Sequence, residues 1–168
     1  MRCAYGSLLL SAGLALLLLS RAPAADPTEP DADGQRLLKK YGVTPDAAGL
    51  RAYFRALRPA EARKEVAALV VKLGSDDFDE RETATRRLTL LALVAEAELK
   101  EAAGNPDAEV ARRAAQVLAA LEADSVPLFQ AALRAAAALR PKGLAGELLA
   151  IVPGLRRDSQ RRAVEETV

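Results

Sequence analysis

Apolar residues recur along this chain at the three- and four-residue spacings that place side chains on one face of a helix. The clearest stripes are Ala47, Leu50, Phe54 and Leu57, followed by Ala62, Val66, Leu69, Val70 and Leu73. Similar stripes continue through residues 84–91, 110–121 and 129–139. No run longer than four residues alternates at the two-residue period of a strand. We therefore predict an all-α protein of about seven to eight short helices.

Residues that favour helix starts stand between these stripes. Thr44 followed by Pro45 predicts an N-cap with proline at the first helical position, where its missing N–H costs nothing. Asp77, with Glu80 three residues later, predicts a capping box in which aspartate takes the place of Ser or Thr. A further helix start is predicted at residues 124–127, which contain aspartate, serine and proline.

One structural unit is present twice, at a spacing of 30 residues. The repeated positions are Gly74, Asp77, Ala84, Leu88 and Leu91 in the first copy, and Gly104, Asp107, Ala114, Leu118 and Leu121 in the second. Each copy has a glycine that ends a helix, an aspartate that starts the next helix, and apolar residues on one face below it. Because so short a unit cannot bury its apolar face alone, tandem copies predict stacking around a continuous core.

The segment between Leu90 and Ala103 contains no glycine or proline. A repeat of about 30 residues nevertheless needs two helices if the chain is to reverse direction within it. We therefore predict a helix break near residues 93–95.

The first 24 residues have the organisation of a secretory signal. Arg2 precedes an apolar run over 8–19, and Ala-Pro-Ala at 22–24 predicts cleavage between Ala24 and Ala25. The run is about a dozen residues, whereas a membrane-spanning helix takes about 20. We therefore predict an exported protein, periplasmic or secreted, which contacts a membrane only if the signal is not cleaved. The single cysteine, Cys3, leaves with the signal.

Residues 74–88 and 105–115 resemble the short HEAT-like repeat, and with its export signal the whole chain resembles exported bacterial HEAT-repeat proteins, a group of largely undefined function. The chain departs from the repeat pattern at Ala111, where an arginine usually follows the valine, and in lacking a glycine-containing turn near 91–94. The resemblance implies a right-handed α-α superhelix, a HEAT-like solenoid.

The chain divides into four segments. After the signal peptide at 1–24, residues 25–34 are acidic and contain proline, which predicts a flexible leader. Residues 35–155 form the helical repeat domain, and 156–168 predict an incomplete, frayed C-terminal helix, because they supply too little apolar surface to cap a stack. Without the two arginines of the signal, 22 basic residues face 23 acidic ones, a net charge of −1 that gives no field to attract nucleic acid.

The residue types present restrict the possible chemistry. The chain has no His or Trp, and Cys3 is lost with the signal. The commonest general base, the thiol nucleophile and the nitrogen and sulfur ligands of zinc are therefore missing. We predict no catalytic residue, no cofactor and no metal site.

Two groups of charged residues are candidate binding sites. The acidic group is Asp76, Asp77, Asp79, Glu80 and Glu82. It does not fit a calcium loop, since counting from Asp77 puts Glu82 where glycine is needed and Leu88 where the bidentate glutamate belongs, so we interpret it as helix capping. Arginine pairs at 86–87, 112–113, 156–157 and 161–162 suggest either a ridge for an anionic partner or a solvated face, and interspersed acidic residues favour the solvated face.

These features favour a non-catalytic exported module that binds another protein or serves as a scaffold. The alternative is an enzyme or enzyme-accessory domain, by analogy with HEAT-like proteins that attach bilin chromophores. The sequence leaves the identity of the partner and the oligomeric state open.

Overall fold

The computed structural model describes residues 32–168, so the predicted signal, its predicted cleavage site at Ala24 and Ala25, and residues 25–31 of the predicted leader lie outside the described residues. Within 32–168 the protein is all-α, as predicted, and contains no strand. The α-helices are α1 (Ala32–Lys40), α2 (Ala47–Ala56), α3 (Pro59–Lys72), α4 (Phe78–Ala102), α5 (Ala108–Ala120), α6 (Val126–Leu139), α7 (Leu144–Ile151) and α8 (Asp158–Thr167). In this part of the chain, none of the helices is long and apolar enough to cross a bilayer.

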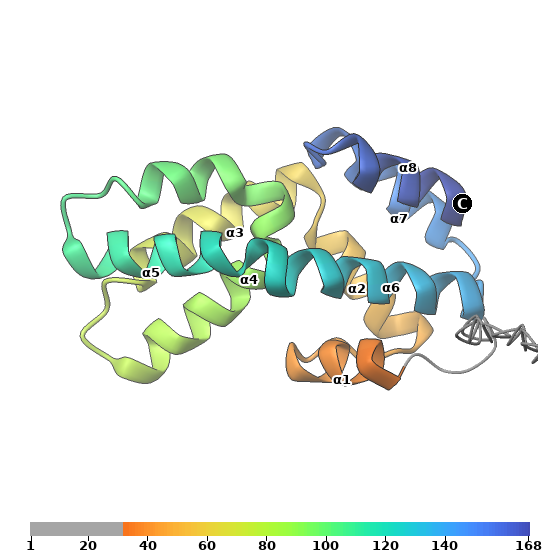
Figure 1. Ribbon diagram of the computed structural model, residues 1–168, viewed down its shortest axis with the longest axis horizontal. Helices are drawn as coiled ribbons and strands as arrows, with labels where there is room; N and C mark the ends of the chain where they lie inside the picture. Colours follow the sequence, from red (N-terminus) through yellow and green to blue (C-terminus); the bar gives the residue numbers. More distant parts are fainter. Residues whose placement is uncertain (1–31) are drawn as a thin grey trace, which may run out of the picture.

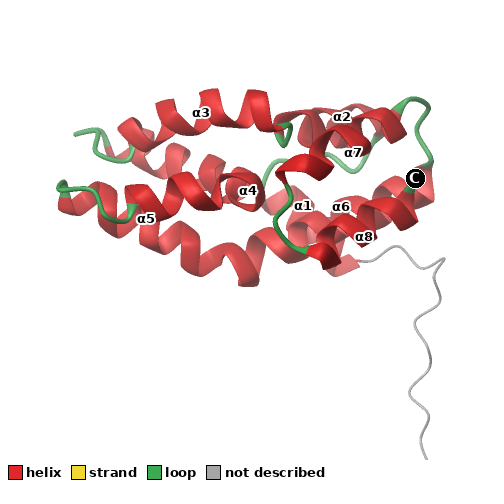
Figure 2. Ribbon diagram, turned by 90° about the horizontal axis from the view of Figure 1, so that it is seen from above, coloured by secondary structure: helices red, strands yellow, loops and turns green. Residues whose placement is uncertain are grey.

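A long rod made of α5 and α6 runs along the molecule (Figure 1). The two helices are joined by η1, a π-helical turn at Leu121–Ser125. At one end, α4 packs between α3 and α5. At the other end, α1, α2 and α8 pack against α6, while α7 packs against α2 and α8, and the view from above shows the same division (Figure 2).

The core is continuous through both ends of the molecule. Leu88, Leu91 and Leu99 of α4 are fully buried at one end. At the other end the Phe54 ring meets the Phe129 ring edge-on, with 6.2 Å between centroids. The packing of these rings adds a directional term to the burial of their large apolar surface. The predicted apolar stripes are therefore the surfaces along which the helices pack.

The chain reverses direction inside α4, as the repeat predicts, but the helix is not interrupted at residues 93–95. Residues 78–102 are assigned as one helix, and Leu93 and Ala95 are buried in it. A straight helix of this length would hold its two ends about 37 Å apart. Instead, a Cβ on Gly74, before α4, would lie 3.4 Å from Asp107 Oδ2, after α4, so the two ends lie together. The two halves of α4 therefore run in opposite directions (Figure 1).

Three other boundaries differ from the prediction. α2 is capped by Asp46, whose Oδ1 accepts from the amides of Ala48 and Gly49 at 2.9 and 2.7 Å, so Thr44 is not the N-cap. The start predicted at 124–127 lies in η1 and the first turn of α6, where the rod continues through the π-helical turn without a break. The leader predicted over 25–34 is too long, because α1 begins at Ala32.

The C-terminal segment also differs from the prediction of a frayed helix. α8 is regular over Asp158–Thr167 and packs against α6 and α7. Val164 is fully buried and Gln160 is nearly so. The two side chains are four residues apart and therefore lie on one face, which is enough to dock a short helix.

Candidate functional site

The two copies of the repeat place equivalent turns side by side at one end of the molecule, where α3 leads into α4 and α4 leads into α5 (Figure 1). Asp77 Oδ1 accepts from the amides of Asp79 and Glu80 at 2.8 and 3.3 Å. Asp107 Oδ1 likewise accepts from the amides at 109 and 110, at 2.9 and 3.1 Å. Both aspartates therefore satisfy amides that a helix N-terminus leaves without a partner.

The capping box predicted at Asp77 forms only in part. The Glu80 side chain does not reach the Asp77 amide but accepts a hydrogen bond from Ser75 Oγ at 2.7 Å. Ser75 Oγ in turn accepts from the Asp77 amide at 3.2 Å. Bonding to Ser75 and then to Lys72 lowers the pKa of Glu80. Ser75 Oγ therefore links the Glu80 carboxylate to the backbone amide of Asp77.

Most of the other repeat positions are buried where the helices pack against one another. Fully buried are Ala84, Leu88, Leu91 and Ala114, and Leu121 is 6% exposed. Leu118 is only partly buried, and Val117 is the neighbouring α5 residue that is 1% exposed. A Cβ on Gly74 would lie 3.0 Å from Val110 Cγ2, so this glycine lets α5 approach closely, whereas a Cβ on Gly104 would meet only Glu101 O at 3.4 Å.

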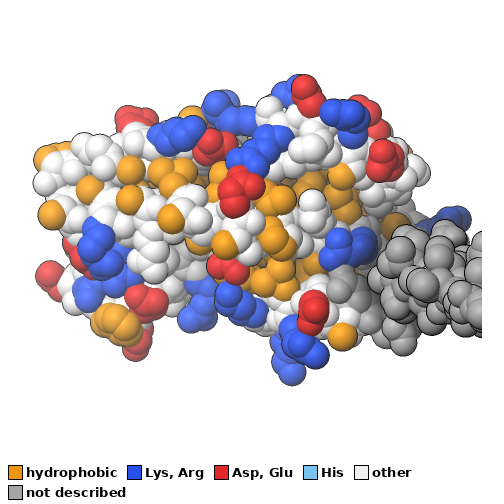
Figure 3. Space-filling model, viewed as in Figure 1, with side chains coloured by type: hydrophobic (Ala, Val, Ile, Leu, Met, Phe, Trp, Pro, Cys, Tyr) orange, Lys and Arg blue, Asp and Glu red, His pale blue; other side chains and the backbone are white. Residues whose placement is uncertain are grey.

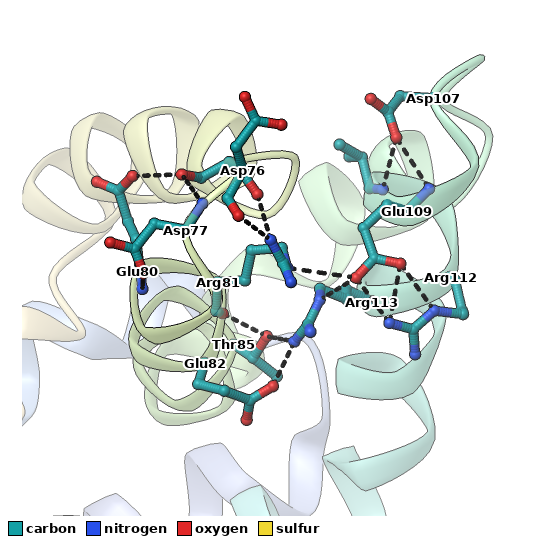
Figure 4. Close-up of polar contacts among 12 residues, drawn as sticks. Asp76, Asp77, Glu80, Arg81, Glu82, Thr85, Asp107, Glu109, Arg112 and Arg113 are labelled. Carbon is teal, nitrogen blue, oxygen red and sulfur yellow. Dashed lines mark hydrogen bonds and ion pairs between the residues drawn. The ribbon is translucent and has the colours of Figure 1, made fainter.

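Arg113 is the centre of an ionic network between α4 and α5 (Figure 4). The residue is only 5% exposed. Its Nε donates to Glu109 Oε1 at 2.6 Å, and its Nη1 donates to Glu82 Oε1 at 2.7 Å and to Thr85 Oγ1 at 3.2 Å. Since Glu82 and Thr85 belong to α4, this guanidinium fixes the position of α5 on α4. Hydrogen bonds to Glu82 and then Glu109 raise the pKa of Arg113.

Arg81 extends the network into the turn before α4 (Figure 4). Its Nη1 donates to the backbone carbonyls of Ser75 and Asp76 at 2.6 and 2.9 Å. Its Nε lies 3.6 Å from Glu109 Oε1, and its guanidinium carbon lies 5.8 Å from the centre of the Phe78 ring. One side chain therefore links the turn, the first residue of α4 and α5.

Glu109 is the carboxylate that most of the arginines in the network contact. It accepts hydrogen bonds from Arg112 at 2.8 to 3.0 Å and from Arg113. These bonds, those from Arg112 first, lower the pKa of Glu109 to about 2. The carboxylate therefore stays ionised at any ordinary pH and cannot donate a proton as a general acid there. Its contacts give it the role of linking Arg112 and Arg113.

We expect this network to make stability depend on pH below about 4.5, the ordinary pKa of Glu109. Because folding lowers that pKa, ionised Glu109 stabilises the folded state above about 4.5, and the contribution is lost as the pH falls toward 2. Thermal midpoints of wild type and Glu109→Gln should therefore differ at pH 7 and converge on acidification. In an Arg112→Met/Arg113→Met background, the same substitution should lose its pH-dependent effect. A constant difference down to pH 2 in the wild-type background would contradict this interpretation.

The predicted acidic group is spread around the turn and does not converge on a point. Asp77 caps α4, Glu80 contacts Ser75 and Lys72, and Glu82 contacts Arg113. Within residues 32–168, no group of three or more carboxylates is arranged to hold a metal ion. The interpretation as helix capping therefore holds for Asp77, whereas Glu80 and Glu82 form ion pairs with other elements.

The arginine pairs do not form a common ridge. Arg87 pairs with Glu65 of α3, and Arg157 pairs with Glu122 of η1. Arg161 donates to the Leu155 carbonyl at 2.9 Å and lies 3.5 Å from Asp158. These pairs link neighbouring elements, which favours the solvated face over a site for an anionic partner.

Two further features were not anticipated from the sequence. The first is a nearly buried glutamate, Glu147 of α7, whose Oε2 lies 2.6 Å from Nη2 of Arg58 and whose Oε1 lies 3.3 Å from Nη2 of Arg55. These arginines stand about 90 residues earlier in the chain, so local spacing gives no sign of the pairing. The only sequence signal is a lone charge inside the apolar segment 144–151.

The second feature is a cavity of about 420 Å³ at the end of the molecule opposite the ionic network. It lies between the end of α6, the start of α7 and the end of α8. Its lining residues are Ala136, Ala137, Arg140, Pro141, Leu144, Ala145, Leu148, Glu166, Thr167 and Val168. Arg140 ends α6 in the left-handed conformation, with φ 42°, a position that usually favours glycine.

Comparison of the chain with protein-family models, with curated proteins and with solved structures finds no match.

Proposed function

We propose that this chain is an exported, non-catalytic scaffold that binds another protein on the outer face of a HEAT-like stack of helices. The observation that carries the proposal is the face shown in Figure 3, where apolar atoms gather over α5 and charged atoms lie mainly above and below them. The exposed alanines of this segment are Ala108, Ala115, Ala119 and Ala123. We refer to Ala115, Ala119 and Ala123 as the alanine face.

Alanine suits a surface that receives another helix. Its side chain is short, so the backbone of a partner helix can approach within the about 8–10 Å of packed helices. It also has no rotamer entropy to lose when it is covered. A long side chain at 115 or 119 would prevent this approach.

The repeat supports a stack behind that face. α3, α4 and α5 follow one another along the chain, and α4 contacts both neighbours. α4 and α5 begin with the same aspartate cap and bury equivalent alanines, Ala84 and Ala114. Stacked repeats present continuous surfaces on which partner proteins bind. The ionic network holds α4 and α5 in register, so the face is formed before a partner arrives.

Affinity capture from the envelope fraction tests the proposal. We expect the protein, purified after expression of the whole chain, to retain a partner that an Ala115→Arg/Ala119→Arg variant loses. Ala68→Arg is the matched control, because Ala68 is also exposed but lies on α3. Equal capture by all three proteins, or no capture by any, would refute binding at the alanine face.

A further inference from the structure

The large apolar side chains left exposed within residues 32–168 lie in two separate groups. Val71 and Phe78, 76% and 60% exposed, flank the turn between α3 and α4. The others, Leu139, Leu149 and Val168, belong to the three elements that surround the cavity. The first group and the cavity lie at opposite ends of the long axis (Figure 1). We call them the head and the tail.

The head carries an exposed ring in an acidic part of the chain. Phe78 is the first residue of α4, and the Arg81 guanidinium lies beside its ring. The turns at 73–80 and 103–109 contain six carboxylates, of which Glu80 pairs with Lys72, and Glu109 pairs with arginines of α4 and α5. Asp76 and Asp79, on either side of Phe78 in the sequence, are exposed.

The tail has the complementary shape and charge. Its cavity of about 420 Å³ is lined by alanine, proline and leucine together with Arg140, Glu166 and Thr167. This volume is within the about 300–1,000 Å³ of binding pockets. Exposed Arg140 and Lys142 stand on the turn between α6 and α7, which contains no acidic residue. Glu166 lies on the opposite wall, formed by α8, so the carboxylates of a docked head would face the turn and not α8.

We propose that the head of one copy docks in the tail of a second copy, with Phe78 as the anchor in the cavity. The inference rests on the proposed scaffold role and names a second copy of this chain as one partner. Because head and tail are different surfaces, a docked pair still has one free head, on one copy, and one free tail, on the other. Such a heterologous contact extends into rows unless it closes into a ring.

Sedimentation of the protein purified after expression of the whole chain tests the docking. We expect the average mass to rise with protein concentration, and high salt to weaken the association because the facing charges are screened. Phe78→Asp should weaken association at least ~10-fold, since it removes the apolar anchor of the contact. Phe78 is exposed, so its replacement leaves the core intact. A monomer at every concentration, or unchanged association of Phe78→Asp, would overturn the proposal.

Charge reversal tests the direction of docking. An Asp76→Lys/Asp79→Lys variant and an Arg140→Glu/Lys142→Glu variant should each associate weakly alone, because like charges then face each other. Mixed in equal amounts they should associate again, since each head then meets a tail of opposite charge. Failure of the mixture to recover would overturn the assignment of these two ends.

Two variants, measured in both experiments, separate this inference from the proposed function. Ala115→Arg/Ala119→Arg lies between head and tail and should associate like wild type while losing the captured partner. Phe78→Asp should show the reverse pattern. Loss of both properties in both variants would contradict two separate surfaces.

Discussion

Leu88→Ala is expected to lower the free energy of unfolding by about 2–5 kcal/mol, the usual result of truncating a fully buried leucine. Leu88 has no exposed surface and lies in α4, where that helix packs between α3 and α5. The cost combines the lost burial of three carbon atoms with the free energy of the cavity that α3 and α5 cannot close. Urea unfolding of the two proteins measures the difference.

Leu118→Ala is the matched comparison, because the repeat makes Leu118 the counterpart of Leu88. Equal burial of the two would predict equal costs. Leu118 is partly exposed, however, so part of its side chain is already in water, and we expect a loss of only about 1 kcal/mol. Equal losses for the two variants would show that α5 packs more deeply than the structure indicates.

Features that depend on residues within one or two helical turns could be predicted from the sequence. The all-α class follows from the apolar stripes, and both caps follow from an aspartate before each stripe. The shallower burial of Leu118 has a tertiary cause. The repeat aligns Leu88 with Leu118, but Val117 is the more deeply buried residue in α5, because packing against α4 and η1 sets the rotation of this helix.

The repeat predicted that the chain reverses direction between its two turns, and the turns before and after α4 do lie together. The repeat did not predict that every residue of this segment would be assigned as helical. A segment without glycine or proline, made of strong helix formers, keeps its residues helical on both sides of a bend. Residues 88–93 are all buried, so tertiary packing and not a turn residue sets the bend.

The ionic network could be predicted in part. Arg113 stands three residues after Val110 and four before Val117, within the apolar stripe of α5, which indicates a buried cation that needs carboxylate partners. Glu109, one turn earlier, follows from helical spacing. Glu82 lies 31 residues away, and its contact depends on how α5 sits on α4, which no local pattern specifies.

Gly49→Ala should destabilise the protein by about 1–3 kcal/mol, although alanine is the better helix former. Gly49 is the third residue of α2, and a Cβ there would lie 2.4 Å from the Thr44 carbonyl oxygen and 2.0 Å from its Oγ1. The hydroxyl can rotate away, but the carbonyl belongs to the backbone that leads into the cap. Hydrogen bonds from the Gly49 amide first, then from Ala48 and Thr44, also lower the pKa of Asp46, so moving this backbone disturbs the cap itself.

Gly146→Ala is the control with the opposite sign. Gly146 lies inside α7, and an added Cβ would meet nothing within 4 Å. The substitution therefore causes no steric clash, and only the higher helix propensity of alanine acts. It should stabilise the protein by about 0.5–1 kcal/mol. Thermal or urea unfolding of both variants gives the two signs in one experiment. If Gly49→Ala proved as stabilising as Gly146→Ala, Thr44 would not fold back over the first turn of α2, and the observed start of that helix would be incorrect.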